Sequence, residues 1–436
     1  ETWSSLGSGS NHTPINGELG SFYRPDGLLA NSKLKWETTI SRNFGIDFGF
    51  LNNRVNGSLE VYWNTTKDLL MAVPVDNTTG YSYQFQNFGK TSNRGIELSV
   101  NVDVINKGDF RFNVGAIYNY NRNKLDELPN ADQYLYSSYW GSSSLVPTND
   151  YMFVEGKAIG LVRGFISEGY YTVDDFNYTN GQYVLKEGVP DITKALTATY
   201  MHPYDLPAGQ TAFPGAAKFR DVDESGTVDL DDATCLGEVM PRHTGSFQLN
   251  FNYKNFDLST NFNWTAGGKV YNVAAMINAS GQEFDGIGAQ RASWVADAFK
   301  VYNVNAAGDL YAVTNPDELR TLNANAKYHL PYHQSGITSS EWLENGSYLR
   351  LQTLTLGYTL PKNWLTKVHV DKIRLYLTAT NLFTITGYSG IDPEVNANPT
   401  GQSGFYSDLR IFPTLNMDFG TYPRARTFTF GANITF

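Results

Sequence analysis

The stretch that decides the fold is "RTFTFGANITF", residues 426–436. In an extended strand, successive side chains point to opposite faces. One face would carry Phe428, Phe430, Ala432, Ile434 and Phe436, and the other Thr427, Thr429, Gly431, Asn433 and Thr435. Two arrangements suit this separation. In a β-sandwich the apolar face meets a second sheet, and in a membrane β-barrel it meets lipid.

The same alternation recurs along the chain and predicts an all-β protein with about ten strands. The clearest cases are residues 96–104, 110–120, 247–253, 258–266 and 354–360. Further strands are expected around residues 39–51, 54–66, 160–171 and 372–385.

The expected connections come in two sizes. Short turns include "NKGD" (residues 106–109) and "YKNFD" (residues 253–257), whereas long connections are expected over about 122–159, 172–243, 268–347 and 386–424. A compact soluble domain seldom contains loops of that length. A membrane barrel combines short turns on one side with long extracellular loops on the other.

Composition narrows the possible functions. The chain has 436 residues, of which 14% are aromatic and only 17% charged, and its net charge is -10. The negative charge and the lack of a basic run argue against nucleic acid as a partner. The single cysteine, Cys235, excludes an internal disulfide framework and is expected to be an inert loop thiol. The first ten residues have no signal-peptide pattern, so an exported precursor would begin upstream of Glu1.

The character of the polar faces favours the membrane barrel. These faces carry Thr, Ser, Asn and Gly more often than Lys or Glu. Aromatic rings stand near the strand ends, as in an interfacial girdle: Trp63, Tyr118, Tyr120, Trp264 and Tyr358. The sequence therefore predicts a transmembrane antiparallel β-barrel in contact with lipid.

Several phrases also resemble one family. They are "LKWETTISRNFGIDFGFLNNRVNGSLEVYWNTTKDLLM" (34–71), "NFGKTSNRGIELSV" (87–100), "YLRLQTLTLGYTLP" (348–361), "LTATNLFTITGYSGIDPEVN" (377–396) and "YPRARTFTFGANITF" (422–436). Together, and in this order, they resemble the carboxy-terminal half of the SusC/RagA-type TonB-dependent transporters of Bacteroidetes outer membranes.

The resemblance implies a 22-stranded barrel closed by a plug and energised through TonB, ExbB and ExbD. It also implies a SusD-like surface lipoprotein as a lid, a dimer of such pairs, and oligosaccharides or oligopeptides as cargo. Residues 1–436 would be the carboxy-terminal part of the barrel domain, without the plug and the first barrel strands. We therefore expect another part of the transporter to pair with the strand near 39–51 and with the last strand, because open edges are costly in lipid. A last strand ending in Phe436 also resembles the recognition signal for barrel assembly.

One acidic motif predicts a metal site. "DVDESGTVDLDD" (221–232) fits the twelve-position calcium loop, with ligands Asp221, Asp223, Ser225, the Thr227 carbonyl, Asp229 and Asp232, and Gly226 at the turn. Asp at the twelfth position reaches less far than Glu, and no helix precedes the loop. The predicted role of Ca²⁺ is structural, in a long surface loop. The open alternative is a solvated acidic turn held by side-chain hydrogen bonds.

Aromatic-rich loops are the candidate cargo contacts. In "YLYSSYW" the rings of Tyr134, Tyr136, Tyr139 and Trp140 lie outside any clean alternation, and could stack on sugar rings. Packing between loops, or against a lipoprotein lid, remains the alternative for each of them.

No sequence feature predicts catalysis. The two histidines of "HLPYH" (329–333) have Pro331 between them, which breaks the helical ligand spacing. The leading hypothesis is the barrel portion of an outer-membrane importer. A secreted soluble β-sandwich that binds carbohydrate and a free-standing barrel enzyme of about ten strands remain as alternatives.

Overall fold

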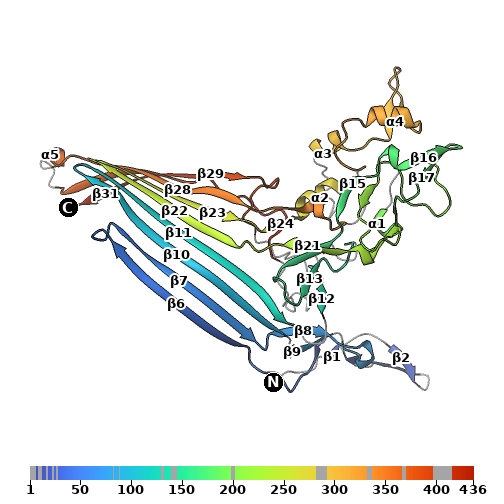
Figure 1. The fold of residues 1–436 in the computed structure, drawn as a ribbon, viewed down its shortest axis with the longest axis horizontal. Helices are drawn as coiled ribbons and strands as arrows, with labels where there is room; N and C mark the ends of the chain where they lie inside the picture. Colours follow the sequence, from blue (N-terminus) through green and yellow to red (C-terminus); the bar gives the residue numbers. More distant parts are fainter. Residues whose placement is uncertain are drawn as a thin grey trace.

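The computed structural model describes residues 6–7, 12–15, 18–21, 24–25, 28–81, 83–87, 89–128, 132–138, 145–197, 202–280, 292–330, 336–365, 370–395 and 415–436 (Figure 1). Its dominant feature is a nine-stranded antiparallel sheet in which each long strand pairs with the next one along the chain. In order, these strands are β6 (Thr38–Phe50), β7 (Val55–Lys67), β10 (Lys90–Lys107), β11 (Phe110–Glu127), β22 (His243–Tyr253), β23 (Phe256–Ala266), β28 (Tyr348–Thr359), β29 (Lys372–Thr386) and β31 (Thr427–Thr435).

Side-chain alternation gives this sheet two different faces. The apolar face contains a row that crosses six strands in register, formed by Phe430, Leu377, Leu356, Leu258, Phe251 and Phe112. The neighbouring row on the polar face is formed by Thr429, Thr378, Thr355, Ser259, Asn250, Asn113 and Asp103. The sequence periodicity is therefore kept in register along these two rows.

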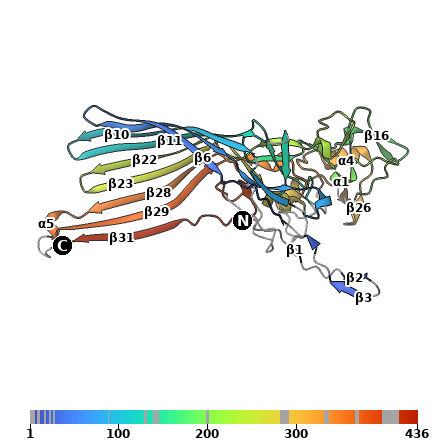
Figure 2. The same cartoon turned by 90° about the horizontal axis from the view of Figure 1, so that it is seen from below.

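The connections separate by size, as expected. Figure 1 shows the tight turns after β6, β10 and β22 at the left end of the sheet and the long segments at the right end. Figure 2 shows β10 to β31 side by side from below. Short helix α5 (Lys362–Leu365) lies in the connection between β28 and β29, at the tight-turn end.

The long segments form their own folded body, which we call the loop lobe (the described residues of 128–242 and 267–347). Its strands are β12 (Gln133–Tyr136), β13 (Tyr151–Val154), β14 (Leu161–Gly164), β15 (Ser167–Tyr170), β16 (Phe176–Thr179), β17 (Gln182–Leu185), β18 (Asp191–Ile192), β19 (Ala217–Phe219), β20 (Thr227–Val228), β21 (Thr234–Glu238), β24 (Lys269–Asn272), β25 (Tyr302–Val304), β26 (Leu310–Ala312) and β27 (Leu343–Asn345). Its helices are α1 (Lys194–Thr197), α2 (Val273–Ser280), α3 (Ala292–Asp297) and α4 (Pro316–Leu322), with 3-10 turns η3 (Val173–Asp175), η4 (Leu230–Asp232) and η5 (Ser340–Trp342).

The remaining short elements come from other segments of the chain. They are β1 (Leu6–Gly7), β2 (His12–Ile15), β3 (Glu18–Ser21), β4 (Arg24–Pro25), β5 (Leu28–Leu29), β8 (Leu70–Pro74), β9 (Tyr83–Asn87), β30 (Met417–Asp418) and the 3-10 turn η1 (Asn77–Thr79). Of these, β30 pairs with β24 and so joins a sheet of the loop lobe. No helix in the part of the chain described here has both the length and the apolar character to cross a membrane.

One predicted strand is divided in two and lies outside the long sheet. Residues 160–171 do not join the long sheet. They form β14 and β15, and β14 pairs with β13 and β21 in the loop lobe. The reason is that consecutive Leu161 and Val162 are both buried, at 5% and 0% exposure, so this segment has protein on both sides. The expected loops 122–159 and 172–243 therefore belong to a single connection between β11 and β22, and the sheet has nine strands rather than about ten.

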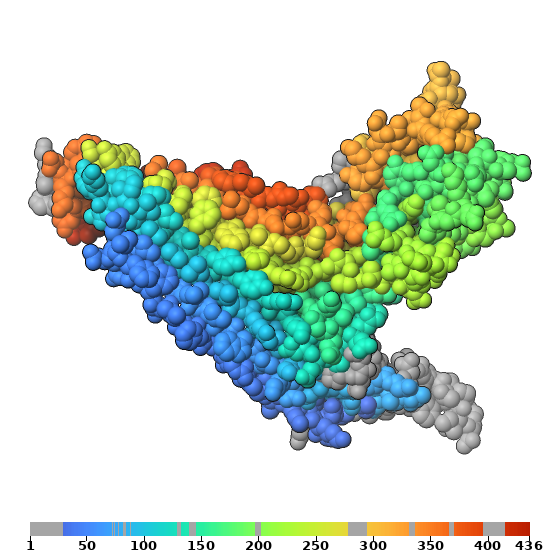
Figure 3. Space-filling view, in the orientation of Figure 1, coloured from blue at the N-terminus to red at the C-terminus, as the bar shows by residue number. Residues whose placement is uncertain are grey.

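The buried core belongs to the loop lobe and the segments that pack on it. Two clusters account for most buried apolar side chains, one around Tyr151 and Tyr271 and the other around Phe165 and Phe213. Buried tyrosines join distant segments by donating to backbone carbonyls: Tyr151 to Leu415 (3.1 Å), Tyr171 to Pro190 (2.7 Å) and Tyr183 to Thr314 (2.8 Å). The tyrosine-rich composition thus supplies rings for the core and hydroxyls that hold the loops together. Figure 3 shows this lobe as a broad mass beyond the slab of the sheet.

Candidate functional site

A continuous polar surface lines one face of the sheet. The Oγ1 atoms of Thr355 and Thr378 are 2.9 Å apart across β28 and β29. Further along the same row, the Ser259 hydroxyl donates to Asn250 (2.6 Å), and Asn113 donates to Asp103 (3.0 Å). Several neighbouring side chains on this face thus hydrogen-bond to one another across the strands. The result is a wall that presents many hydroxyl and amide groups.

One ion pair on this wall spans three strands. On β29, the Arg374 guanidinium donates to both carboxylate oxygens of Asp257 on β23, reaching across the intervening β28. Gly357 makes this possible, since a Cβ at that position would lie 2.5 Å from the arginine and the carboxylate. A bidentate pair of this kind fixes both side chains in place.

The opposite face is apolar and uncovered. Phe430, Leu377 and Leu356 are 73%, 44% and 46% exposed, although all three belong to one regular row. Soluble domains rarely expose contiguous apolar patches of such size. In a β-sandwich these residues would be buried against a second sheet. The alternative of a soluble sandwich is therefore wrong, because the described residues bury the apolar side chains of the loops and expose those of the sheet.

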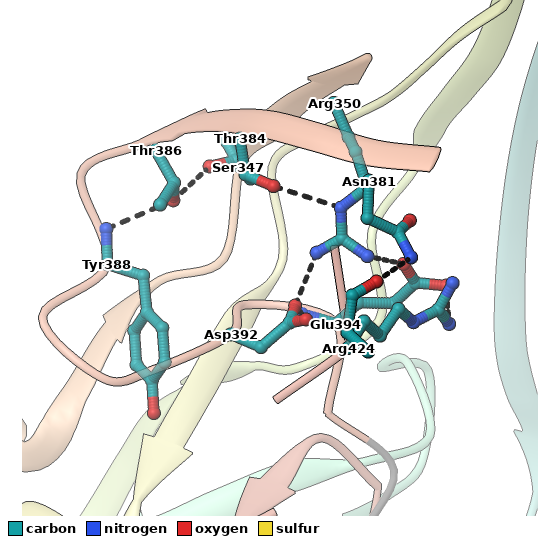
Figure 4. A network of polar contacts seen from close by, with 10 residues as sticks. Ser347, Arg350, Asn381, Thr384, Thr386, Tyr388, Asp392, Glu394 and Arg424 are labelled. Atoms are coloured by element: carbon teal, nitrogen blue, oxygen red, sulfur yellow. Dashed lines mark hydrogen bonds and ion pairs between the residues drawn. The ribbon is translucent and has the colours of Figure 1, made fainter. Parts of the chain in front are cut away.

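A buried ionic network locks one loop to the sheet (Figure 4). Arg350 on β28 donates to Asp392 (2.5 Å), Glu394 (2.9 Å) and the Thr384 hydroxyl (3.0 Å). Arg424 extends the network by donating to Glu394 (2.6 Å). The segment following β29 is thereby held against the ends of β28 and β29, at the junction of the sheet with its long connections.

Tyr388 anchors the same loop from its other side. Its backbone amide donates to the Thr386 hydroxyl (3.1 Å), and its phenol donates to Asp418 (2.6 Å), which is also buried. These residues of the "GYSGIDPEVN" stretch were not predicted as site residues. In the sequence they stood out only as part of a stretch that resembles the family. Their partners Arg350 and Asp418 are distant in sequence, so local spacing does not reveal these contacts.

The predicted calcium loop is folded as a compact acidic turn. Carboxylate oxygens of Asp221, Asp223 and Asp232 lie within 4.8 Å of one another, so these three residues could hold a metal ion. Asp232 is fully buried and accepts from the backbone amides of Val222 (2.5 Å) and Asp229 (2.8 Å).

The other predicted ligands have different roles in this turn. Asp229 caps η4 by accepting from the Asp231 amide (2.8 Å), and it is not in the converging group. The Ser225 hydroxyl donates to the Thr227 carbonyl (3.0 Å), which engages both atoms with each other. Gly226 has a φ of +87°, as the sharp turn requires. Hydrogen bonds from Ser225 hold the pKa of the exposed Asp223 carboxyl below its ordinary value.

The predicted aromatic contacts divide into two groups. Tyr136 on β12 is 4% exposed, and its ring stacks on Phe153 at 4.8 Å, so burial raises the pKa of its hydroxyl. Tyr134 is half-buried against the same cluster. The Tyr136 ring therefore presents no open stacking face, which favours the packing alternative for this residue. Tyr139 and Trp140 lie outside the described residues.

A buried histidine–carboxylate contact was also missed. Nε2 of His329 lies 3.9 Å from a carboxylate oxygen of Glu341. Burial raises the pKa of Glu341 to about 7 and lowers the pKa of His329 to about 4. Sequence reasoning had examined His329 only as half of a helical metal pair, and its partner is not adjacent in sequence.

Known proteins resemble this chain over most of its length. A family model described as "TonB dependent receptor-like, beta-barrel" matches residues 5–382. TonB-dependent receptor P3 of Formosa agariphila is 30% identical over 409 residues, which cover 94% of this chain and 35% of that protein. TonB-dependent receptor SusC of Bacteroides thetaiotaomicron is 26% identical over 417 residues, covering 93% of this chain and 32% of that protein. The chain thus spans about a third of the length of the curated relatives it matches.

Among solved structures, the RagAB peptide transporter superposes with a TM-score of 0.64 at 21% identity. The match covers 100% of this chain and 38% of that one. At that identity the likeness establishes the fold.

Proposed function

This chain belongs to the TonB-dependent receptor β-barrel family, and we propose that it forms the carboxy-terminal part of the barrel of a SusC/RagA-type nutrient importer in the outer membrane of a Gram-negative bacterium. The observation that carries this proposal is the pairing of an uncovered apolar face with a hydrogen-bonded polar face on one sheet. Lipid suits the first face and a water-filled passage suits the second. The named relatives are receptors and transporters, not enzymes.

The two outer strands of the sheet indicate where the rest of the barrel would attach. In the described sheet, β6 pairs only with β7 and β31 pairs only with β29. Their free edges would leave backbone groups unsatisfied within a bilayer, at several kcal/mol for each group. Strands of an amino-terminal barrel portion, which would also carry the plug, are the proposed partners of both edges.

Transport in this proposal depends on the polar wall. Hydroxyl and amide groups such as those of Thr355, Thr378 and Asn250 bind weakly and can exchange hydrogen bonds with water. A cargo that meets many such groups is held at each step but not trapped. The wall suits neutral, hydrogen-bonding cargo, and the proposed classes are oligosaccharides and oligopeptides. RagAB, a structural relative, is named as a peptide transporter.

The proposed partners act at the two ends of the barrel. A SusD-like lipoprotein would sit over the loop lobe, and TonB with ExbB and ExbD would pull the plug from the opposite side. A dimer of such pairs is part of the same proposal. The breadth of the folded lobe supports a docking role, because its two buried clusters give it a defined shape.

The test uses the complete transporter in its native host. Membrane fractionation should place it in the outer membrane, with detergent needed for extraction, and affinity purification should recover a plug-bearing polypeptide and a surface lipoprotein. Uptake of labelled oligosaccharides and oligopeptides should require TonB. Recovery of the protein in the soluble fraction without detergent would contradict the proposal.

We also propose that the loop formed by residues 221–232 binds Ca²⁺ in a structural role. The sequence pattern and the convergence of Asp221, Asp223 and Asp232 support it. The loop ends in η4 of the lobe, where bound metal would stiffen a surface segment and take no part in cargo chemistry.

A further inference from the structure

The apolar face becomes basic near the long-loop end of the sheet. Arg42 on β6, Arg94 on β10 and Arg122 on β11 lie in one row, with Trp63 on β7 between the first two. Lys124 stands two residues beyond Arg122 on the same face, opposite Ser92. We call Arg42, Arg94, Arg122 and Lys124 the basic row. It occupies the side of the sheet that carries the exposed phenylalanine and leucine rows.

Nearby carboxylates do not neutralise the positive charges of the basic row. In the described part of the chain, no carboxylate lies within ion-pair distance of Arg42, Arg94 or Arg122, and Lys124 has only Asp126 at 3.5 Å. On the polar face, by contrast, Arg350 and Arg374 both have carboxylate partners. Arg94, Arg122 and Lys124 moreover share one hollow of about 270 Å³ with Ser92. Like charges gathered around one hollow repel one another unless an anion enters it.

An apolar hollow adjoins the basic one. It has a volume of about 500 Å³ and is lined by Val61, Trp63, Ile96 and Tyr120, together with Arg94 at its border. Val61, Ile96 and Tyr120 form the next row on the same face, two residues along the strands and roughly 7 Å from the basic row. An anionic group and an apolar chain would therefore fit side by side here.

We propose that this part of the outer wall binds a phosphorylated membrane lipid. Its phosphate would lie among Arg94, Arg122 and Lys124, and its acyl chains against Val61, Ile96 and Tyr120. Arginine suits this role because its planar fork donates two parallel hydrogen bonds to phosphate. Trp63 and Tyr120 stand at the level where aromatic rings meet lipid headgroups. The inference rests on the proposed placement of the sheet in a membrane.

The height of the apolar face agrees with that placement. From Arg94 to Ile105, which lies on the same face of β10 opposite Phe112, there are eleven residues, or roughly 36 Å along the strand. A strand tilt of about 35–45° shortens that span to roughly 26–30 Å, close to the lipid-facing band of about 25 Å in outer-membrane barrels. The basic row thus marks the headgroup level at the long-loop side.

The test measures lipid bound to the complete transporter, purified in detergent, by native mass spectrometry. The probes are lipid A, dephosphorylated lipid A with the same acyl chains, and inorganic phosphate. We expect strong preference for the phosphorylated lipid, and Arg94→Gln/Arg122→Gln should lower its binding about tenfold or more. The matched control is Lys107→Gln/Lys254→Gln, which removes the same charge at the tight-turn end and should leave binding unchanged. Lys124→Glu offers a second route to the same loss if the double variant fails to assemble.

Three results would overturn the inference. They are equal binding of the two lipids, unchanged binding in both the double variant and Lys124→Glu, and displacement of the lipid by an equal concentration of inorganic phosphate. The last result would reduce the site to one for small anions. These failures differ from failure of the importer proposal, which would appear as a protein that needs no detergent.

Discussion

Arg350 and Asp392 form a buried ion pair, with 2.5 Å between a guanidinium nitrogen and a carboxylate oxygen and only 3% and 9% of their side chains exposed. The pair joins β28 to the loop that follows β29, across 42 residues of sequence. Each of these buried charges needs the other as its partner, because water does not reach either of them. This contact therefore controls the position of the loop at the junction between the sheet and the loop lobe.

Arg350→Met should release this loop. The substitution leaves Asp392 buried without its cation, for which we expect a loss of about 3–5 kcal/mol. Limited proteolysis should then cleave near residues 387–395 much faster than in the wild type. Arg424→Met is the control, because Arg424 and Glu394 are both partly exposed and such pairs contribute about 0–1 kcal/mol. If protease cleaved Arg350→Met and Arg424→Met at the same rate, the assigned role of Arg350 would be contradicted.

Glu341 should make the stability of the loop lobe depend on pH. Burial raises its pKa from 4.5 to about 7, so the folded state keeps a proton that the unfolded state loses. Its contribution is fully present below about pH 4.5 and is lost as pH rises through 7, a change on the order of 3 kcal/mol. His329 acts in the opposite sense: its folded pKa of about 4 makes stability fall as pH drops from 6.5 to 4.

Glu341→Gln isolates the first effect. Relative to the variant, the free energy of unfolding of the wild type should fall as pH rises from 4.5 to 7. Above that range the difference between the two proteins should level off. Denaturant titration of the purified protein at a series of pH values measures this difference. Glu187→Gln, at an exposed loop position, controls for the loss of one carboxylate. A difference that stays constant with pH would show that Glu341 is not buried as described.

Calcium should stabilise the loop lobe through the turn at residues 221–232. Millimolar Ca²⁺ should raise the melting temperature of the wild type, and chelation should reverse the increase, since a ligand that binds only the folded state stabilises it. Asp223→Asn should abolish the response, because this exposed carboxylate belongs to the converging group. Glu224→Gln removes the same charge from the next residue and should keep the response. A wild type indifferent to both calcium and chelator would favour the alternative of a plain acidic turn.

Gly95 and Gly115 test how closely aromatic rings pack over the polar wall. A Cβ on Gly95 would lie 2.3 Å from the Tyr62 ring and 2.5 Å from the backbone oxygen of Tyr120, whereas a Cβ on Gly115 has its nearest neighbour at 3.8 Å. Gly95→Ala should therefore cost about 1–3 kcal/mol through overpacking. Gly115→Ala, on the neighbouring strand and the same face, should change stability by less than about 0.5 kcal/mol. The folded fraction, read from the heat-dependent shift of the barrel on gels, compares them.

The period of two was sufficient to predict most of the sheet, because its strands have different environments on their two faces. Thr427 to Thr435 alternates without a break, and the structure keeps that alternation as β31. The same rule failed at Leu161 and Val162, where burial on both sides removes the contrast between faces. Alternation marks a strand that separates two environments, and it gives no information on strands inside the loop lobe.

The site was predictable only where its residues are close in sequence. Asp221, Asp223 and Asp232 come together within one turn, so spacing alone could group them. Arg350 and Asp392 meet only because β28 and β29 pair and the following loop folds back. For Tyr136 the sequence left cargo contact and loop packing both open, because it does not show that this loop has its own buried cluster.

Phe430 and Thr429 provide the strictest test of which face meets lipid. They are neighbours on β31, and their side chains lie on opposite faces, Phe430 beside Leu377 and Thr429 beside Thr378. Phe430→Arg would place a cation in the acyl-chain region near the middle of the strand, at a cost of about 2–4 kcal/mol. Thr429→Arg would place the same cation on the hydrated polar wall, where the cost should be much smaller. Assembled protein recovered from the outer membrane should fall sharply for the first variant and little for the second. The reverse order would mean that the polar face, and not the apolar one, is turned toward the bilayer.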